Sequence, residues 1–242
     1  MSDLKSAVAS LVKADGASHV WVPTDFAAFG NRDAIDKTLQ RMVRSGELRR
    51  IDRGLYDRPT INRLTKRPTS ADYRAVVDAI ARRDQLRLLV DGMTAANDLG
   101  LTDAVPARVT IYTDARHRSI QSGKLIIQFK LAAPSRLYWA GRPAMRVVQA
   151  LHWLQDMLST DGARITKTLA RILGDSKHGN AIRDDLAQGF SVLPVWMQAY
   201  LRTVPGFTAA LTARSNLSPG RKTPLATTKS PPKPKPRKAA PK

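Results

Sequence analysis

The 242-residue chain contains no cysteine and almost no glutamate. The absence of cysteine excludes a disulfide framework and any metal site built from thiolates. Glu47 is the only glutamate, and the aspartates lack the close spacing that suggests paired-carboxylate or two-metal catalysis. The sequence therefore excludes thiolate chemistry and has no acidic spacing that favours a metal-dependent enzyme.

Short motifs for the common enzyme classes are missing as well. The sequence has no G-x-G-x-x-G, no G-x-x-x-x-G-K-[ST] and no G-x-S-x-G, and its four histidines show no H-E-x-x-H spacing. We therefore expect a protein that is not an enzyme and that uses no cofactor and no metal ion. A site assembled from residues far apart in the sequence would escape this argument.

Long hydrophobic runs are also absent. No stretch approaches the roughly 18 apolar residues of a membrane span, and the first residues lack the apolar core of a signal peptide. We expect a soluble, cytoplasmic protein without a membrane partner.

Positive charge is abundant. Forty Lys and Arg residues against 20 Asp and Glu residues give a net charge of +20. A balance of this kind indicates a polyanionic partner, most often nucleic acid and sometimes an anionic membrane surface.

The segment from His19 to Pro59 has the pattern of two helices followed by a basic hairpin. Thr24 is the expected N-cap of a short helix that ends at Phe29, and Asn31 is the expected N-cap of a longer helix that Gly46 ends. A short helix, a tight turn, a longer helix and a hairpin follow one another in a winged helix-turn-helix. The segment therefore predicts an N-terminal winged helix-turn-helix that binds DNA.

The second helix of this segment divides into two faces at about 100° per residue. Its apolar face is expected to pack inward. In helix-turn-helix proteins the second helix lies in the major groove, where Lys, Arg, Gln and Asp side chains recognise base edges. The candidate base readers are Arg32, Asp33, Lys37 and Gln40, and Asn31, Arg41 and Arg44 are further candidate DNA contacts.

A change of period after Gly46 predicts the hairpin, or wing. Two short β-prone runs flank Asp52-Arg53-Gly54, and a Gly in such a loop is typical of a hairpin turn. The basic wing residues are expected to contact phosphates or an adjacent minor groove. These residues are Arg49, Arg50 and Arg53.

A second interpretation of the same pattern is a plain amphipathic helix pair with a solvated polar face. Under that interpretation Asp33 only complements the positive N-terminal end of its helix.

The segment PTDFAAFGNRDAIDKTLQRMVRSGELRRIDRGLYDRP resembles the N-terminal domain of AbiEi-type antitoxins, which are regulators of type IV toxin–antitoxin and abortive-infection systems. The wing, LRRIDRGLYDRP, is the most specific part, and blocks at 91–114 and 131–154 resemble the second domain of that family. The resemblance covers roughly residues 19 to 175. It implies repression at promoter inverted repeats, cooperative between bound copies, and a second domain that counters a nucleotidyltransferase-like toxin.

The rest of the chain predicts two further parts. A helix over 4–13 completes the DNA-binding domain, 1–68, which ends in a basic connector over 60–68. Residues 69–213 predict an α+β domain with a helix over 69–83 capped by Ser70, a small antiparallel sheet with strands near 86–90, 109–112, 118–121 and 125–130, and helices at its C-terminal end.

The last part, residues 214–242, is rich in proline and carries nine basic residues and no acidic ones. Such a composition predicts a disordered basic tail that contacts nucleic acid non-specifically or only aids solubility.

Together these patterns predict a DNA-binding autorepressor that is also an antitoxin. Two alternatives stay open. The protein is a transcription factor without a toxin partner, whose second domain senses a ligand or mediates dimers, or it is a general nucleic-acid-binding protein dominated by its tail.

Overall fold

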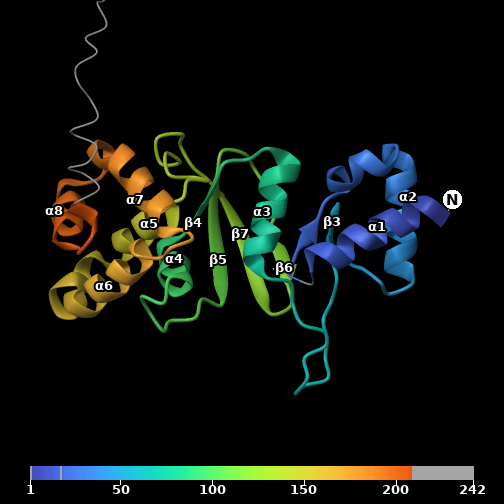
Figure 1. The fold of residues 1–242 in the computed structure, drawn as a ribbon, viewed down its shortest axis with the longest axis horizontal. Helices are drawn as coiled ribbons and strands as arrows, with labels where there is room; N and C mark the ends of the chain where they lie inside the picture. The colour runs from blue at the N-terminus through green and yellow to red at the C-terminus, as the bar shows by residue number, and fades with distance from the viewer. Residues whose placement is uncertain (1, 17, 209–242) are drawn as a thin grey trace, which may run out of the picture.

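The computed structural model describes residues 2–16 and 18–208, which form eight α-helices, three short 3-10 helices and two small sheets (Figure 1). The fold is α+β, as the sequence predicts. None of the helices in these residues is both long enough and apolar enough to cross a lipid bilayer. The predicted tail at 214–242 lies outside the described residues.

Residues 2–58, here called the N-terminal unit, contain three helices and a small antiparallel sheet with strand order β1-β3-β2. The elements are α1 (Ser2–Asp15), β1 (Val20–Trp21), η1 (Pro23–Phe29), α2 (Arg32–Arg44), β2 (Arg49–Asp52) and β3 (Leu55–Asp57).

Capping residues set the limits of α2. The Asn31 side-chain oxygen accepts a hydrogen bond from the Ala34 amide at 2.9 Å, as expected of an N-cap. Gly46 follows the helix with φ +76°, in the left-handed region that glycine tolerates best. Both predictions for this helix are confirmed.

The expected N-cap of η1 is wrong. The helix begins at Pro23, so Thr24 lies inside it. Proline suits the first helical position because its φ is fixed and the amide hydrogen that it lacks would have no helical partner there. The cap is made instead by Asp25, whose carboxylate accepts from the Val22 amide at 2.9 Å.

The apolar sides of α1, η1 and α2 meet in one small core. Val8 of α1, Phe26 of η1, and Ile35 and Leu39 of α2 are fully or almost fully buried there. The predicted inner face of the longer helix is therefore confirmed.

Residues 69–208, the second unit, contain a four-stranded sheet and most of the helices. The strand order is β4-β5-β7-β6. The elements are α3 (Tyr73–Asp84), β4 (Leu88–Val90), α4 (Gly92–Asp98), β5 (Arg108–Thr113), β6 (Ile120–Ser122), β7 (Leu125–Leu131), α5 (Met145–Leu154), η2 (Gln155–Met157), α6 (Leu158–Leu173), α7 (Gly179–Gln188), η3 (Phe190–Val192) and α8 (Val195–Thr203).

The sheet is mixed rather than antiparallel, which corrects the prediction. β6 takes the outer edge and turns at Gly123 into β7, which returns between β6 and β5. β7 therefore runs parallel to β5, with Val109 paired to Ile127.

The first helix of the second unit starts later than predicted. Its N-cap is Asp72, which accepts from the Arg74 amide at 2.9 Å, and Ser70 precedes the helix. The chain before Asp72 is held in place by other partners, because the Thr69 amide donates to the Thr60 carbonyl and Ser122 donates to the Ala71 carbonyl.

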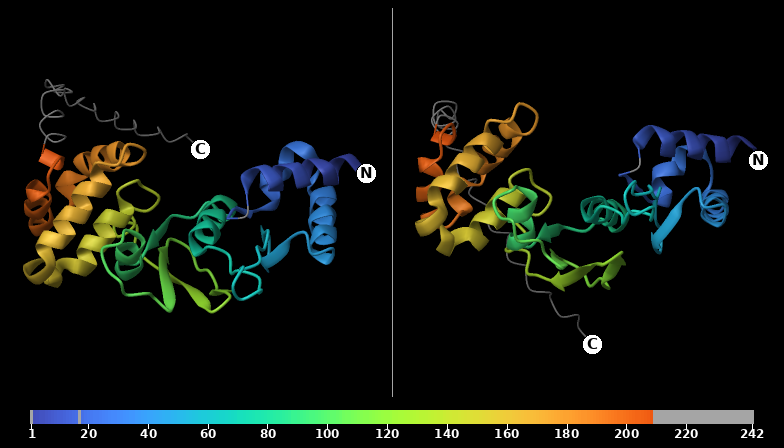
Figure 2. Two further views of the ribbon diagram at one scale, coloured as in Figure 1. Left: turned by 60° about the horizontal axis from the view of Figure 1, so that its bottom comes forward. Right: turned by 90° about the horizontal axis from the view of Figure 1, so that it is seen from below.

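The two units are packed against each other. α3 lies between the two sheets, and α4 to α8 gather at the far end of the four-stranded sheet (Figures 1 and 2). Val20, Val22 and Leu55 of the N-terminal unit belong to the same buried cluster as Val76 and Ile80 of α3. The predicted connector over 60–68 forms a loop that projects from the molecule, closed at its base by a bridge between Ile61 and Pro68 (Figure 1).

Candidate nucleic-acid interface

A polar groove of about 660 Å3 lies where α2, the β2–β3 hairpin and the second unit meet. It is called the groove below. The side chains in its lining that can donate hydrogen bonds to a polyanion include Arg32, Gln40, Arg50, Arg53, Arg83 and Arg118.

The structure brings four of the predicted DNA-binding residues together in this groove. Arg32 and Gln40 come from α2, and Arg50 and Arg53 come from the hairpin. All four are exposed. Arg32 pairs with Asp36 one turn along the helix at 2.9 Å, yet its side chain stays 62% exposed.

The remaining predicted residues of α2 lie outside the groove lining but at the surface. They follow the outward side of the helix and its far margin, as the helical period predicts. These exposed residues are Asp33, Lys37, Arg41 and Arg44. Asn31 is exposed too, but its side-chain oxygen is occupied by the N-cap hydrogen bond.

Arg49 differs from the other candidates because its guanidinium is engaged inside the protein. It donates to both carboxylate oxygens of Asp57, at 3.0 and 2.5 Å, and to the Thr69 carbonyl at 2.8 Å. Asp57 is buried, so this pair ties β2 to β3 and to the start of the second unit. The structure therefore gives Arg49 an architectural role.

The tip of the hairpin is held by the second unit. Gly54 turns the chain with φ +67°, and the Arg83 guanidinium donates to the Arg53 carbonyl. Arg118, from the segment before β6, reaches Asp52 at 2.6 Å. The tip is thus fixed in position rather than free in solvent.

Sequence reasoning missed Arg83 and Arg118 as groove residues. Arg83 lies in the last turn of α3 and Arg118 in a loop, and neither belongs to a local motif that indicates a binding site. Only the packing of the two units brings them to the groove.

Positive charge exceeds negative charge in the groove. Its lining contains five arginines and three aspartates, Asp36, Asp52 and Asp84. The hydrogen bond from Arg83 holds the pKa of Asp84 below its usual value, so Asp84 is ionised at neutral pH. The remaining excess of arginine favours a phosphate-bearing partner.

Metal binding finds no support in the described residues, which contain no cluster of three or more His, Asp or Glu side chains placed to hold an ion. What the groove lining does offer is hydrogen-bond donors and positive charge.

The comparison with known proteins gives a family but no activity. No curated protein matches the chain. A family profile matches residues 7–177, from α1 to the connection after α6, and so includes every element that lines the groove. The chain belongs to this family, which is described as a family of unknown function (DUF6088).

Proposed function

We propose that this protein is a DNA-binding transcriptional regulator whose N-terminal unit acts as a winged helix-turn-helix. In this proposal α2 is the recognition helix, the β2–β3 hairpin is the wing, and double-stranded DNA is the partner. The order of α1, η1, α2 and the hairpin supports it, because winged helix-turn-helix domains have the same order.

The observation that carries the proposal is the exposed polar side of α2 next to a groove rich in arginine. The outward residues Lys37 and Gln40 present side chains that suit guanine and adenine edges. Arg50 and Arg53 line the same groove as Gln40, and in this proposal they contact phosphates that flank the recognised bases.

The resemblance to AbiEi-type antitoxins extends the proposal. It supports an autorepressor that acts at inverted repeats near its own promoter, and a second unit that neutralises a toxin encoded alongside. The resembling blocks at 91–114 and 131–154 include α4, β5 and α5, so we assign the neutralising role to the second unit.

DNA binding is tested with the full chain and the duplex that lies immediately upstream of its gene. A shuffled duplex of equal length and composition is the control, and both affinities are measured at two salt concentrations. The proposal predicts tighter binding to the upstream duplex at both salt concentrations. Equal affinities that fall together with salt would contradict it and would indicate a general nucleic-acid-binding protein.

The antitoxin role is tested by co-expression with the neighbouring toxin-like reading frame and a promoter reporter. The double variant Lys37→Ala, Arg50→Ala should lose repression and still protect the cell, because both changes lie in the N-terminal unit. Loss of both functions in a folded variant would show that protection runs through transcription alone.

A further inference from the structure

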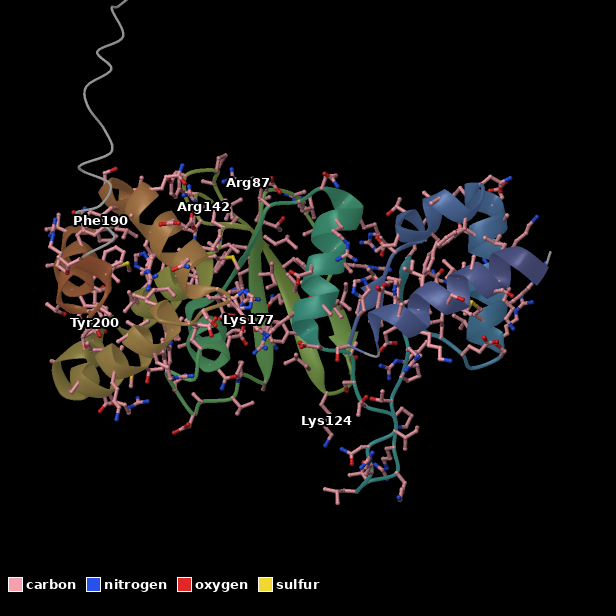
Figure 3. The ribbon with its side chains drawn as sticks, viewed as in Figure 1. Arg87, Lys124, Arg142, Lys177, Phe190 and Tyr200 are labelled. Atoms are coloured by element: carbon pink, nitrogen blue, oxygen red, sulfur yellow. The ribbon has the colours of Figure 1, made fainter. Side chains whose placement is uncertain are left out.

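A second concave site lies in the second unit, apart from the groove. It has a volume of about 790 Å3 and lies among α3, α4, α5 and the connection between α6 and α7. Lys177, labelled near the centre of Figure 3, belongs to this connection, and its neighbour His178 lines the cavity. It is called the α3–α7 cavity below.

A buried carboxylate fixes two arginines at the wall of this cavity. The Asp98 side chain is only 2% exposed. It accepts from the Tyr73 hydroxyl, from Nε and Nη2 of Arg74 at 3.1 and 2.7 Å, and from Nε of Arg146 at 3.0 Å. Because guanidinium groups are planar, these bonds also fix the direction of their remaining N–H groups.

Some N–H groups of the cavity arginines make no hydrogen bond within the described residues. Within the described residues, no hydrogen bond uses Nη1 or Nη2 of Arg146, and no hydrogen bond or ion pair involves Arg171. Asp98, by contrast, is occupied by three side chains, and Asp175 accepts from the amides of Lys177 and His178 at 3.1 and 2.8 Å. The lining contains as many aspartates as arginines, and exposed Asp78 has no hydrogen-bond partner among the described residues. The unused donors include the Nη groups of Arg146 and the whole Arg171 guanidinium.

Apart from Asp78 and His178, the rest of the lining is apolar. Leu99, Val147, Ile172 and Ile182 contribute hydrocarbon side chains to the same cavity. Its volume falls in the range of about 300 to 1,000 Å3 that is typical of small-molecule sites, where a few polar groups orient a mostly apolar ligand.

We propose that the α3–α7 cavity binds a small organic anion with an apolar body. The anionic group is held by the free N–H groups of Arg146 and Arg74, with Arg171 nearby, and the apolar body lies against the hydrocarbon side chains. This binding does not depend on the proposed DNA-binding function.

The probe for the test is octanoate, which joins a carboxylate to an apolar chain. Binding to the full chain with labelled Ile, Leu and Val methyl groups is followed by NMR, with octanol and octylamine as uncharged and cationic probes of the same length. The expected result is saturable shifts of the Ile172 and Ile182 methyl groups with octanoate, and binding at least about tenfold weaker for the other two probes.

Two variants sharpen the test. Arg146→Gln should weaken octanoate binding by about tenfold, the scale of one lost charge-assisted hydrogen bond. Arg171→Gln, at an exposed position without a partner among the described residues, should weaken it without altering the fold. Lys130→Gln, at an exposed position of β7 outside the cavity lining, is the matched control and should bind octanoate as the wild type does.

Any one of four results would overturn the proposal. Octanol could bind as tightly as octanoate, the shifts could map outside the α3–α7 cavity, or both arginine variants could bind octanoate like the wild type. The absence of saturable binding below the micelle concentration of octanoate would equally contradict it.

Discussion

Charged side chains of α2 in the N-terminal unit stay at the surface, whereas two carboxylates of the second unit, Asp98 and Asp185, are buried and paired with arginines. Arg32 of α2 is paired with Asp36 but 62% exposed. Asp185 of α7 is 9% exposed and accepts from Nε and Nη2 of Arg142 and from the Ala144 amide. The ion pair on α2 thus leaves its charges at the surface, whereas the pair between Asp185 and Arg142 contributes to the architecture of the second unit.

This difference separates candidate binding residues from structural ones better than residue type does. Arg49 and Arg50 are neighbours in a basic hairpin, but Arg49 is bonded to buried Asp57 while Arg50 is exposed in the groove. In this hairpin the exposed arginine is therefore a better candidate for contacting DNA than the arginine bonded to a buried carboxylate. The predictions below test this distinction.

The largest effect is expected from Asp185→Ala. The change removes a buried carboxylate, leaves the Ala144 amide without its partner and leaves the Arg142 guanidinium with only its hydrogen bond to Gln188. We expect the free energy of unfolding to fall by about 3–5 kcal/mol, measured by urea denaturation. Arg32→Ala, which removes an exposed pair, should cost less than about 1 kcal/mol. Equal losses in the two variants would contradict the comparison.

The next effect concerns the exposed side of α2. Lys37→Ala or Gln40→Ala should each weaken binding to the upstream duplex by about 1–3 kcal/mol, because each is proposed to contact a base edge. Unfolding should be almost unchanged, since both side chains are exposed. Lys167→Ala, at an exposed position of α6, is the control. Wild-type affinity in both α2 variants would show that this helix does not read DNA.

A smaller effect is expected at the tip of the hairpin. Arg53→Ala should weaken binding to all duplexes about equally and reduce the slope of log affinity against log salt by about one, because the residue is expected to contact a phosphate. The slope is measured by titrations over a range of salt concentrations. A loss confined to one base-pair substitution would instead make Arg53 a base reader.

The smallest effect concerns acid stability at the groove. The hydrogen bond from Arg83 lowers the pKa of Asp84 from 3.8, so the folded state binds this proton less readily than the unfolded state does. Asp84 therefore stabilises the fold above pH 3.8, and this contribution is lost as the pH falls through the lowered folded pKa. The stability difference between wild type and Asp84→Asn should shrink on acidification. A difference independent of pH would contradict this assignment.

Features that depend on residues close together in the sequence could be predicted from the sequence. Local hydrogen bonding explains the N-cap at Asn31, and the backbone freedom of glycine explains the end of α2 at Gly46 and the hairpin turn at Gly54. The helical period explains the two faces of α2. For the same reason the helical period is enough to predict which α2 residues are exposed.

Features that depend on packing could not be predicted in this way. Three such features join residues that are distant in the sequence. They are the hydrogen bonds of Arg49 to Asp57 and Thr69, the parallel pairing of β5 with β7, and the packing that brings Arg83 and Arg118 to the groove. The start of α3 at Tyr73 belongs to this group as well, because residues 69–71 are held by Thr60 and Ser122.

We propose that the N-terminal unit presents the main DNA-binding surface, whereas the buried pair of Asp185 and Arg142 in the second unit stabilises the fold. Hydrogen–deuterium exchange of the full chain, with and without the upstream duplex, tests it most directly. The account predicts slower exchange in α2 and in the β2–β3 hairpin on DNA binding, and unchanged exchange in α7 around Asp185. Protection confined to the C-terminal helices, with none in α2, would contradict it.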